Sequence, residues 1–428
     1  MAKKILYLIL FSLLLFFSGC KMASTLLEET IHPKNHDYNR SAKLLNQCEF
    51  NQVIQLLENN KNKLLKNSEE GLVYYYQNQS KKSNSYFDKA IDIYRENENK
   101  ALFDVSTFLT QEYQGEAYDK AFLHNYKAIN YLMLGDAESA RVEAKNSNII
   151  QQEARSKLNG LKNREKDSKN QHLLSRYDKL FQSVNAKHNP YQNPFAYYIS
   201  ALSYAEDEDY ANALIDIRHA ITFAPDSKIL KDKLKLYSQK KRVDSIELFF
   251  DIGQSPLKSQ IELEMEMKNG EKRAVPLPTF SLSKSNIDYI EIIDSDGVSV
   301  AKTSLLTDIN AIKINEFKEK LPAMISIISR ELALSIGSET LNNQSKLLAG
   351  VLKAGMAIYS QVDTATWSLL PQKILVASFP ITKKKSYKII VYSKDGIILK
   401  KSALAIASNS STKNRYKHFL LRKNRICY

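Results

Sequence analysis

Two regions with different hydrophobic patterning follow one another along the chain. From Tyr38 to about Leu236, apolar residues recur every three or four positions, which predicts a run of amphipathic helices. After Arg242 apolar and polar residues alternate, as in Ser245–Asp251 and Gln260–Met267, and this alternation predicts β-strands. The pattern therefore predicts an α+β protein, with an all-α region first and a sheet-bearing region second.

The segment from 197 to 225 has the spacing of a tetratricopeptide hairpin. Small residues would let two helices approach closely, a tyrosine would fill their interface, and a proline would stop the second helix. These residues are Ala201, Ala213, Ala220, Tyr204 and Pro225. The spacing thus predicts two helices joined by a short polar turn.

Weaker copies of this hairpin occur at Gly71–Ala90 and Ala128–Ala140, and Ala42–Leu65 is expected to cap the stack. Three repeats are about the minimum for a stacked core, so residues 38–240 are predicted to form a tetratricopeptide-like solenoid. The charged segment Arg155–Asp178 is interpreted as a solvated helix extension or a linker. Such repeats bind proteins on a concave face, or serve only as a rigid spacer.

Residues 241–428 are predicted to form a β-sandwich or an open sheet with an inserted helical layer at about 308–361. Within the insertion, a helix over Ile314–Leu334 is expected to break or bend near Pro322. A second, apolar helix at Leu347–Tyr359 would be a core helix or would insert into lipid. The remaining predicted strands are Ile287–Ile293, Lys373–Phe379, Tyr387–Tyr392, Ile397–Lys400 and Leu404–Ala407.

The N-terminus has the pattern of an export signal. Lys3 and Lys4 precede the apolar run Ile5–Phe17, which is too short to cross the ~30 Å hydrocarbon core as a helix. Ser18-Gly19-Cys20 follows and resembles a bacterial lipobox, in which Cys20 is acylated after cleavage. We expect a signal peptide at 1–19 and a lipidated linker at 20–37; cleavage by an ordinary signal peptidase is the alternative. Lys21 after the cysteine favours the outer membrane, facing the periplasm, by analogy with enteric sorting rules.

The chain has 428 residues and a formal net charge of +14. Outside the cytoplasm this charge does not predict a nucleic-acid partner, and anionic lipid, lipopolysaccharide, peptidoglycan or an acidic protein face fits better. The basic segment Lys413–Arg425 would touch such anions or form a solvated strand or tail. Cys48 and Cys427 would pair in an oxidising periplasm or remain two unpaired thiols.

Sequence motifs for catalysis are absent. The seven histidines are scattered and include no HExxH pair, and the chain has no GxSxG elbow and no glycine-rich phosphate loop. We therefore expect a protein that is not an enzyme and that needs no metal or cofactor.

The single tryptophan lies in the pattern Asp-x-x-x-Trp-x-x-Leu-Pro, formed by Asp363, Trp367, Leu370 and Pro371. We expect Asp363 to cap a turn and Trp367 to bury its ring, with the indole N–H donating to a carbonyl. Recognition of a ligand by this loop is the alternative.

This pattern, the following Phe379-Pro380, the pair Arg330-Glu331 and the Gly135-Asp136 turn together resemble an uncharacterised family of tetratricopeptide-type bacterial envelope lipoproteins. The resemblance covers nearly the whole mature chain, although the arginine expected between Asp363 and Trp367 is missing. It implies the architecture more than an activity, with activators of penicillin-binding proteins as a related theme. We expect a lipid-anchored scaffold or adaptor for envelope proteins, with direct binding of peptidoglycan or lipopolysaccharide by the basic C-terminal half as the alternative.

Overall fold

The structure is a computed structural model that describes residues 38–100, 113–162, 171–184, 191–240, 244–266, 270, 272–337, 364–382, 386–406, 415–422 and 425–427. The predicted signal peptide and linker at 1–37, with Cys20, lie outside the described residues. The predicted helix Leu347–Tyr359 and the motif residue Asp363 also lie outside them. Within the described part of the chain, no helix is both long and apolar enough to cross a membrane.

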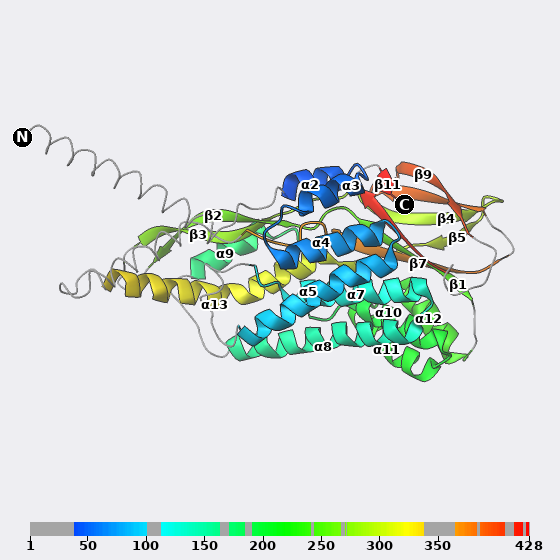
Figure 1. Cartoon of the computed structure of the whole chain (residues 1–428), viewed down its shortest axis with the longest axis horizontal. Coiled ribbons are helices and arrows are strands. Elements are labelled where there is room, and N and C mark those ends of the chain that lie inside the picture. The colour runs from blue at the N-terminus through cyan, green and yellow to red at the C-terminus, as the bar shows by residue number, and fades with distance from the viewer. Residues whose placement is uncertain are drawn as a thin grey trace, which may run out of the picture.

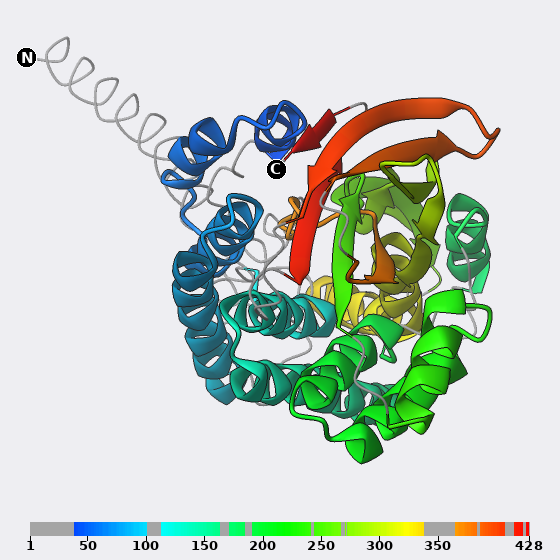
Figure 2. The same ribbon diagram turned by 90° about the vertical axis from the view of Figure 1, so that its right-hand side faces the viewer.

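The first half is helical, as predicted. The helices are α2 (Tyr38–Leu45), α3 (Phe50–Leu57), α4 (Lys63–Tyr76), α5 (Ser80–Lys100), α7 (Ala117–Leu134), α8 (Ala137–Lys162), α9 (Gln171–Leu180), α10 (Pro194–Glu206), α11 (Tyr210–Phe223) and α12 (Lys228–Ser238). The three predicted hairpins are present as α4–α5, α7–α8 and α10–α11. Figure 2 shows the helices following one another along a curve, with strands of the second half on its inner side.

Local chemistry explains why these hairpins form. Gly135 ends α7 with φ of 80°, a left-handed conformation that glycine adopts at low cost, and the Asp136 side chain then accepts from the Ser139 N–H at the start of α8. In the first hairpin, a Cβ on Gly71 would lie 2.5 Å from the Phe87 ring, so only glycine allows this approach of α4 and α5. The small residues Ala201, Ala213 and Ala220 are likewise fully buried.

Two open sheets form most of the second half (Figure 1). The five-stranded sheet has the order β11 (Arg425–Cys427), β10 (Tyr416–Arg422), β1 (Ser245–Ile252), β7 (Lys373–Pro380) and β6 (Ser304–Asp308). The four-stranded sheet has the order β5 (Ser299–Lys302), β4 (Ile287–Asp294), β8 (Ser386–Ser393) and β9 (Ile398–Ala405). Strand β1 pairs parallel with β10, and the other pairs are antiparallel.

An elongated arm extends from these layers. It consists of the hairpin β2 (Leu257–Glu266) and β3 (Lys272–Ser281), the helix α13 (Ile309–Gly337) and α9, which share one apolar cluster. Of the break or bend predicted near Pro322, the break is wrong, because α13 continues through this proline. Pro322 is solvent-exposed, so the carbonyl that loses its helical N–H partner can bond to water.

Two expectations differ from the structure in detail, and the strands β3, β5 and β6 were not predicted. The predicted strands Ile397–Lys400 and Leu404–Ala407 both overlap the single strand β9. The segment Arg155–Asp178 extends helix α8 as far as Lys162, as one alternative expected, but it also includes Leu173 and Tyr177 of α9, which are buried in the arm.

Both faces of the five-stranded sheet are covered. Ile246, Leu248, Phe250 and Ile252 of β1 point toward the four-stranded sheet and share one apolar cluster with its inner residues. Phe249 on the opposite face belongs to a larger cluster that includes α4, α7 and α10. The helices therefore pack on the chain's own sheet, and the two halves share a core.

A disulfide between Cys48 and Cys427 closes this arrangement, with 5.7 Å between the two Cα atoms. It joins the turn between α2 and α3 to the last described strand, across 379 positions of sequence. The Arg425 guanidinium donates to the Gln47 carbonyl (3.0 Å) beside it. Of the two alternatives for these cysteines, the structure has the pair.

Candidate functional site

Strand β1 carries two buried carboxylates on its helix-facing side. Glu247 and Asp251 lie on either side of Phe249 and are each 1% exposed. Because side chains in a strand alternate between faces, these three residues all point toward the helices. A carboxylate at such depth is stable only when hydrogen bonds or an opposite charge replace its hydration.

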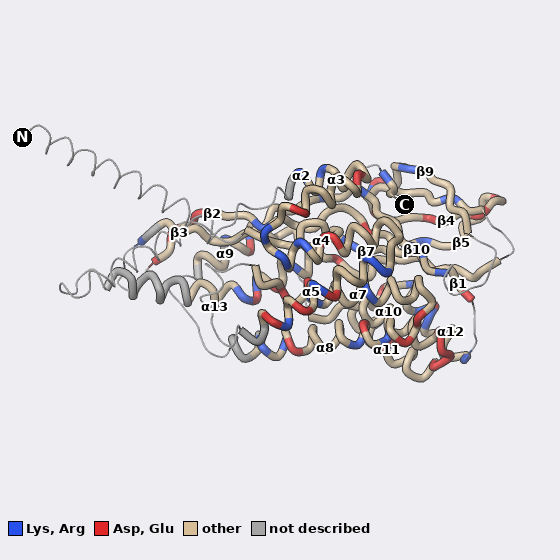
Figure 3. The backbone as a smooth tube through the Cα atoms, viewed as in Figure 1, with Lys and Arg blue, Asp and Glu red and all other residues tan. Residues whose placement is uncertain are grey.

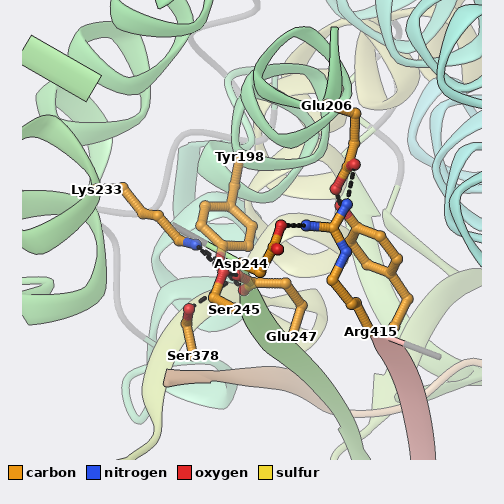
Figure 4. A network of polar contacts seen from close by, with 9 residues as sticks. Tyr198, Glu206, Lys233, Asp244, Ser245, Glu247, Ser378 and Arg415 are labelled. Carbon is orange, nitrogen blue, oxygen red and sulfur yellow. Dashed lines mark hydrogen bonds and ion pairs between the residues drawn. The ribbon is translucent and has the colours of Figure 1, made fainter. Parts of the chain in front are cut away.

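Glu247 has four such partners (Figure 4). Its carboxylate accepts hydrogen bonds from Tyr198 Oη (2.6 Å), Ser245 Oγ (2.6 Å) and Ser378 Oγ (2.8 Å), and it forms an ion pair with Lys233 Nζ. These partners come from α10, α12, β1 and β7. The network therefore fastens two helices to two central strands.

A second ion cluster lies beside the first (Figure 4). Arg415, directly before β10, pairs with Glu206 at the end of α10 and with Asp244 before β1 (2.7 Å to Asp244). Tyr416 also donates to Glu206. Arg415 is only 5% exposed and Arg422 only 1%, so these two charges of the basic C-terminal segment do not lie on a solvated face.

Asp251, unlike Glu247, forms no ion pair with any residue that the structure describes. Its Oδ2 accepts from Tyr76 (2.8 Å) and from Tyr126 (2.9 Å). Burial raises the pKa of this carboxyl to about 6, and the two phenol donors oppose the shift. Tyr75, Tyr76 and Tyr126 are all at most 1% exposed, so this inner surface of the helices is closed by the sheet.

The tryptophan loop is part of the same closed interface. Trp367 is fully buried and its ring meets Phe87 and Tyr126 edge-on, with centroids 6.3 and 6.4 Å away. Leu370 is fully buried and Pro371 is also buried. The expected indole hydrogen bond was wrong, because Trp367 Nε1 has no acceptor among the described residues. Its backbone carbonyl instead accepts from Lys313 Nζ (3.0 Å).

Titratable groups with shifted pKa values gather near this loop. Burial raises the pKa values of Glu69 and of Asp119 to about 7 each and lowers that of Lys313 to about 8. Glu69 accepts from both the N–H (3.0 Å) and the hydroxyl (2.6 Å) of Ser368, and Lys313 also donates to Ser255 (3.1 Å). A cavity beside Lys313 measures about 30 Å³, room for about one water molecule.

A larger recess, the α12 groove, opens between α12, β5 and the end of β7. Its volume is about 590 Å³. Charged and hydroxyl side chains line it together with apolar ones: Lys228, Asp232, Lys233, Ser245, Ser299, Lys302, Ser378, Ile229, Leu236, Val300, Ala301, Phe379 and Pro380. Lys233, Ser245 and Ser378 also belong to the Glu247 network, so hydrogen bonds and an ion pair with Glu247 fix three of the side chains that line the groove.

The polar groups at the base of this lining are bound to one another. The amine of Lys233 is held by Glu247 and by Ser245 (3.0 Å to Ser245), and Ser378 donates to the same carboxylate. The described residues contain no cluster of three or more His, Cys, Asp or Glu side chains that could hold a metal ion. The groove offers cations, hydroxyls and apolar surface to a ligand.

The structure brings some predicted residues together and separates others. Ala201, Ala213 and Ala220 meet within the α10–α11 hairpin, while Tyr204 is half-buried with Arg141 and Lys145 above its ring. Pro225 follows the end of α11 by two positions. Trp367, Leu370 and Pro371 lie far from the α12 groove, in the closed interface.

Sequence analysis missed Glu247, Asp251 and Lys233. The signal was present: two acidic residues four positions apart interrupt the apolar strand SIELFFDI, so both must share one face. The sequence does not show which residues bind these carboxylates, because the partners lie in distant elements; Tyr198 and Ser378, for example, both bind Glu247.

Comparison with known proteins adds no relative. No protein-family model matches the chain, and a search of curated proteins finds no significant match.

Proposed function

We propose that this protein is a lipid-anchored adaptor of the bacterial cell envelope that binds another envelope protein and catalyses no reaction. The anchor is Cys20, at the outer membrane and facing the periplasm. The lipobox pattern Ser18-Gly19-Cys20 supports this placement, and so does the Cys48–Cys427 disulfide, since disulfides persist mainly in oxidising compartments.

The finer architecture belongs to this proposal. We infer that the helical hairpins form a tetratricopeptide-type superhelix and that the two sheets form a β-sandwich, as in the family resemblance drawn from the sequence. The curve of helices in Figure 2 and the apolar cluster shared by the two sheets support this view.

One observation carries the adaptor proposal: the concave side of the helices is filled by the chain's own sheet, while the α12 groove remains open. Tyr75, Tyr126 and Tyr198, which would line an open concave face, are fully buried. The α12 groove combines lysines with apolar side chains, the mixture that protein interfaces use for anchoring and orientation. Partner binding is therefore assigned to this groove.

The test is recovery of a partner from envelope extracts with the full-length lipoprotein. The groove variant Lys228→Glu/Ser299→Glu is compared with the control Lys400→Glu/Ala403→Glu, which makes the same charge change at exposed positions of β9. We expect a stoichiometric partner with the wild type and the control and its loss with the groove variant. No stoichiometric partner, or equal recovery with all three, contradicts the proposal. Incorporation of labelled palmitate by the wild type but not by Cys20→Ala tests the anchor.

A second candidate function, direct binding of peptidoglycan or lipopolysaccharide, is favoured by one surface feature. On the outer face of the four-stranded sheet, Tyr289 and Tyr392 stack with ring centroids 4.7 Å apart, and Lys302 lies 3.4 Å above the Tyr289 ring. Aromatic rings beside a cation suit an anionic glycan. Sedimentation with purified sacculi at increasing salt tests this function: binding that is lost in Tyr289→Ala/Tyr392→Ala and weakened by salt supports it, and no sedimentation excludes it.

A further inference from the structure

Part of the five-stranded sheet has a free edge inside the α12 groove. Strand β7 pairs with β1 from Lys373 to Pro380, but β6 pairs with its other side only from Lys373 to Val376. Among the described strands, Ala377–Pro380 therefore have a neighbour on one side only. The chain reaches this edge at Ser304 from β5, the outermost strand of the other sheet, which lies near β7 without pairing to it.

The backbone of this free edge points into the groove. The Ile381 N–H donates to the Asp244 carbonyl of the β1 side (2.8 Å). Because backbone groups of an antiparallel strand alternate in direction, Phe379 and Ala377 also face β1, whereas the N–H and C=O of Ser378 face outward. Pro380 has no N–H, so the edge ends there and offers about four residues, a length of ~13 Å.

Two walls flank this edge, one formed by β5 with the end of β7 and the other by α12. Val300 and Phe379 provide apolar surface on one wall, and Ile229 and Leu236 of α12 provide it on the other. An extended peptide held at a sheet edge gains affinity from main-chain hydrogen bonds and specificity from pockets for its alternate side chains.

The charge of the groove selects the kind of peptide. Lys228, whose side chain is 84% exposed, stands at the rim and forms an ion pair with Asp232 (2.6 Å). Lys231 and Lys235 lie exposed on the same helix, and Lys302 lies on the β5 side of the groove. Elsewhere basic and acidic residues are interspersed over helices and sheets (Figure 3). This local excess of lysine complements an acidic segment.

We propose that the α12 groove takes an extended acidic segment of a partner protein, which adds as a short β-strand beside Ala377–Pro380. This inference rests on the proposed adaptor function and specifies its ligand. The added strand takes the place that β6 leaves free, with its acidic side chains toward the exposed lysines of α12 and its apolar side chains toward Val300 and Phe379.

The test uses fluorescence anisotropy with the mature, disulfide-bonded protein and a labelled peptide of alternating glutamate and valine. Three comparison peptides accompany it: one with lysine for glutamate, one N-methylated at alternate backbone positions, and one scrambled with proline. We expect saturable binding of the glutamate–valine peptide and at least a tenfold loss for each comparison peptide, because each one lacks either the negative charges or the extended backbone with free N–H groups that the groove binds.

The matched variants are Ser378→Pro and Ser378→Ala. Both remove the hydroxyl that donates to Glu247, but only proline removes the outward N–H. We expect Ser378→Pro to bind the peptide at least tenfold more weakly than Ser378→Ala, which lacks the same hydroxyl but keeps the outward N–H, with circular dichroism showing both folded. Equal binding by the two variants, equal binding of the N-methylated peptide, or no binding by the wild type overturns strand addition. Because partner recovery from extracts is measured separately, strand addition can fail while the adaptor function stands.

Discussion

The two faces of the five-stranded sheet are packed by different chemistry. Toward the four-stranded sheet, β1 presents Ile246, Leu248 and Phe250, all of them apolar and at most 1% exposed. Toward the helices it presents Glu247 and Asp251, which are satisfied by tyrosines, serines and a lysine. On the apolar face, any side chains of suitable volume can fill the space between the sheets. On the polar face, each carboxylate requires particular hydrogen-bond donors or a cation. The difference implies that the helix–sheet contact is specified more strictly than the sheet–sheet contact.

Breaking the Glu247 ion pair gives the largest expected effect. Lys233→Met leaves the carboxylate buried without its cation, and removing one member of a buried pair costs about 3–5 kcal/mol. The free energy of unfolding from urea denaturation measures this loss. In the double variant Lys233→Met/Glu247→Gln no buried charge remains, so we expect recovery of much of the loss. A double variant no more stable than the single one contradicts this account.

Reduction of the Cys48–Cys427 disulfide comes next. The bond restricts the unfolded chain by closing a very long loop, and loss of a native disulfide costs about 2–5 kcal/mol. Urea denaturation of the mature protein with and without reductant measures the change. A Cys48→Ser/Cys427→Ser variant should match the reduced protein and be insensitive to reductant. Equal stability of the oxidised and reduced proteins would show that the bond adds nothing.

Glu69 should make the stability depend on pH. Its folded pKa of about 7 lies above the ordinary value of 4.5, so the folded state holds its proton more tightly than the unfolded state does. The contribution of Glu69 is complete below about pH 4.5, declines as the pH rises, and is lost above pH 7. Across this window it amounts to about 3 kcal/mol at most.

The variant Glu69→Gln isolates this contribution, because it cannot titrate. We expect the stability of the wild type relative to Glu69→Gln to fall by up to about 3 kcal/mol between pH 4.5 and pH 7.5. The opposite dependence expected from His418, whose pKa burial lowers to about 3, is present in both proteins and cancels. A stability difference that does not change with pH would exclude a shifted Glu69.

The smallest effect is expected on the sheet–sheet side. Ile292→Val removes one methyl group from the fully buried apolar cluster and should cost about 0.5–1.5 kcal/mol, without a change in pH dependence. The same urea titrations measure it. A loss as large as that of Lys233→Met would remove the contrast between the two faces.

Local patterns could be predicted from the sequence, and long-range pairings could not. The α7–α8 turn follows from Gly135 and Asp136, because it depends on neighbours within a few positions. The α4–α5 hairpin follows from its repeat spacing, although Gly71 and the Phe87 ring that it meets are 16 positions apart. Strand β3 contains Pro276 and Pro278, and prolines argue against a strand when only the sequence is considered. The strand forms because β2 pairs with it along its whole length. In α9, the surrounding charged residues hid the four-residue spacing of Leu173 and Tyr177, so this buried helix face was not predicted.

The site was less predictable than the fold. Glu69 and Ser368 are 299 positions apart, and nothing near either residue indicates the other. The α12 groove depends on where β6 stops pairing with β7, which is a matter of register between strands separated by α13. The acidic residues of β1 were the one signal in the sequence, and they mark the interface rather than the groove.

The central claim is that the chain's own sheet closes the inner side of its helices. Hydroxyl-radical footprinting of the native mature protein, read by mass spectrometry, tests it most directly. The account predicts that Tyr75, Tyr126 and Tyr198 are modified at least an order of magnitude more slowly than Tyr289 and Tyr392, and reach the same rate only after unfolding. Comparable modification of both sets in the native protein would contradict it.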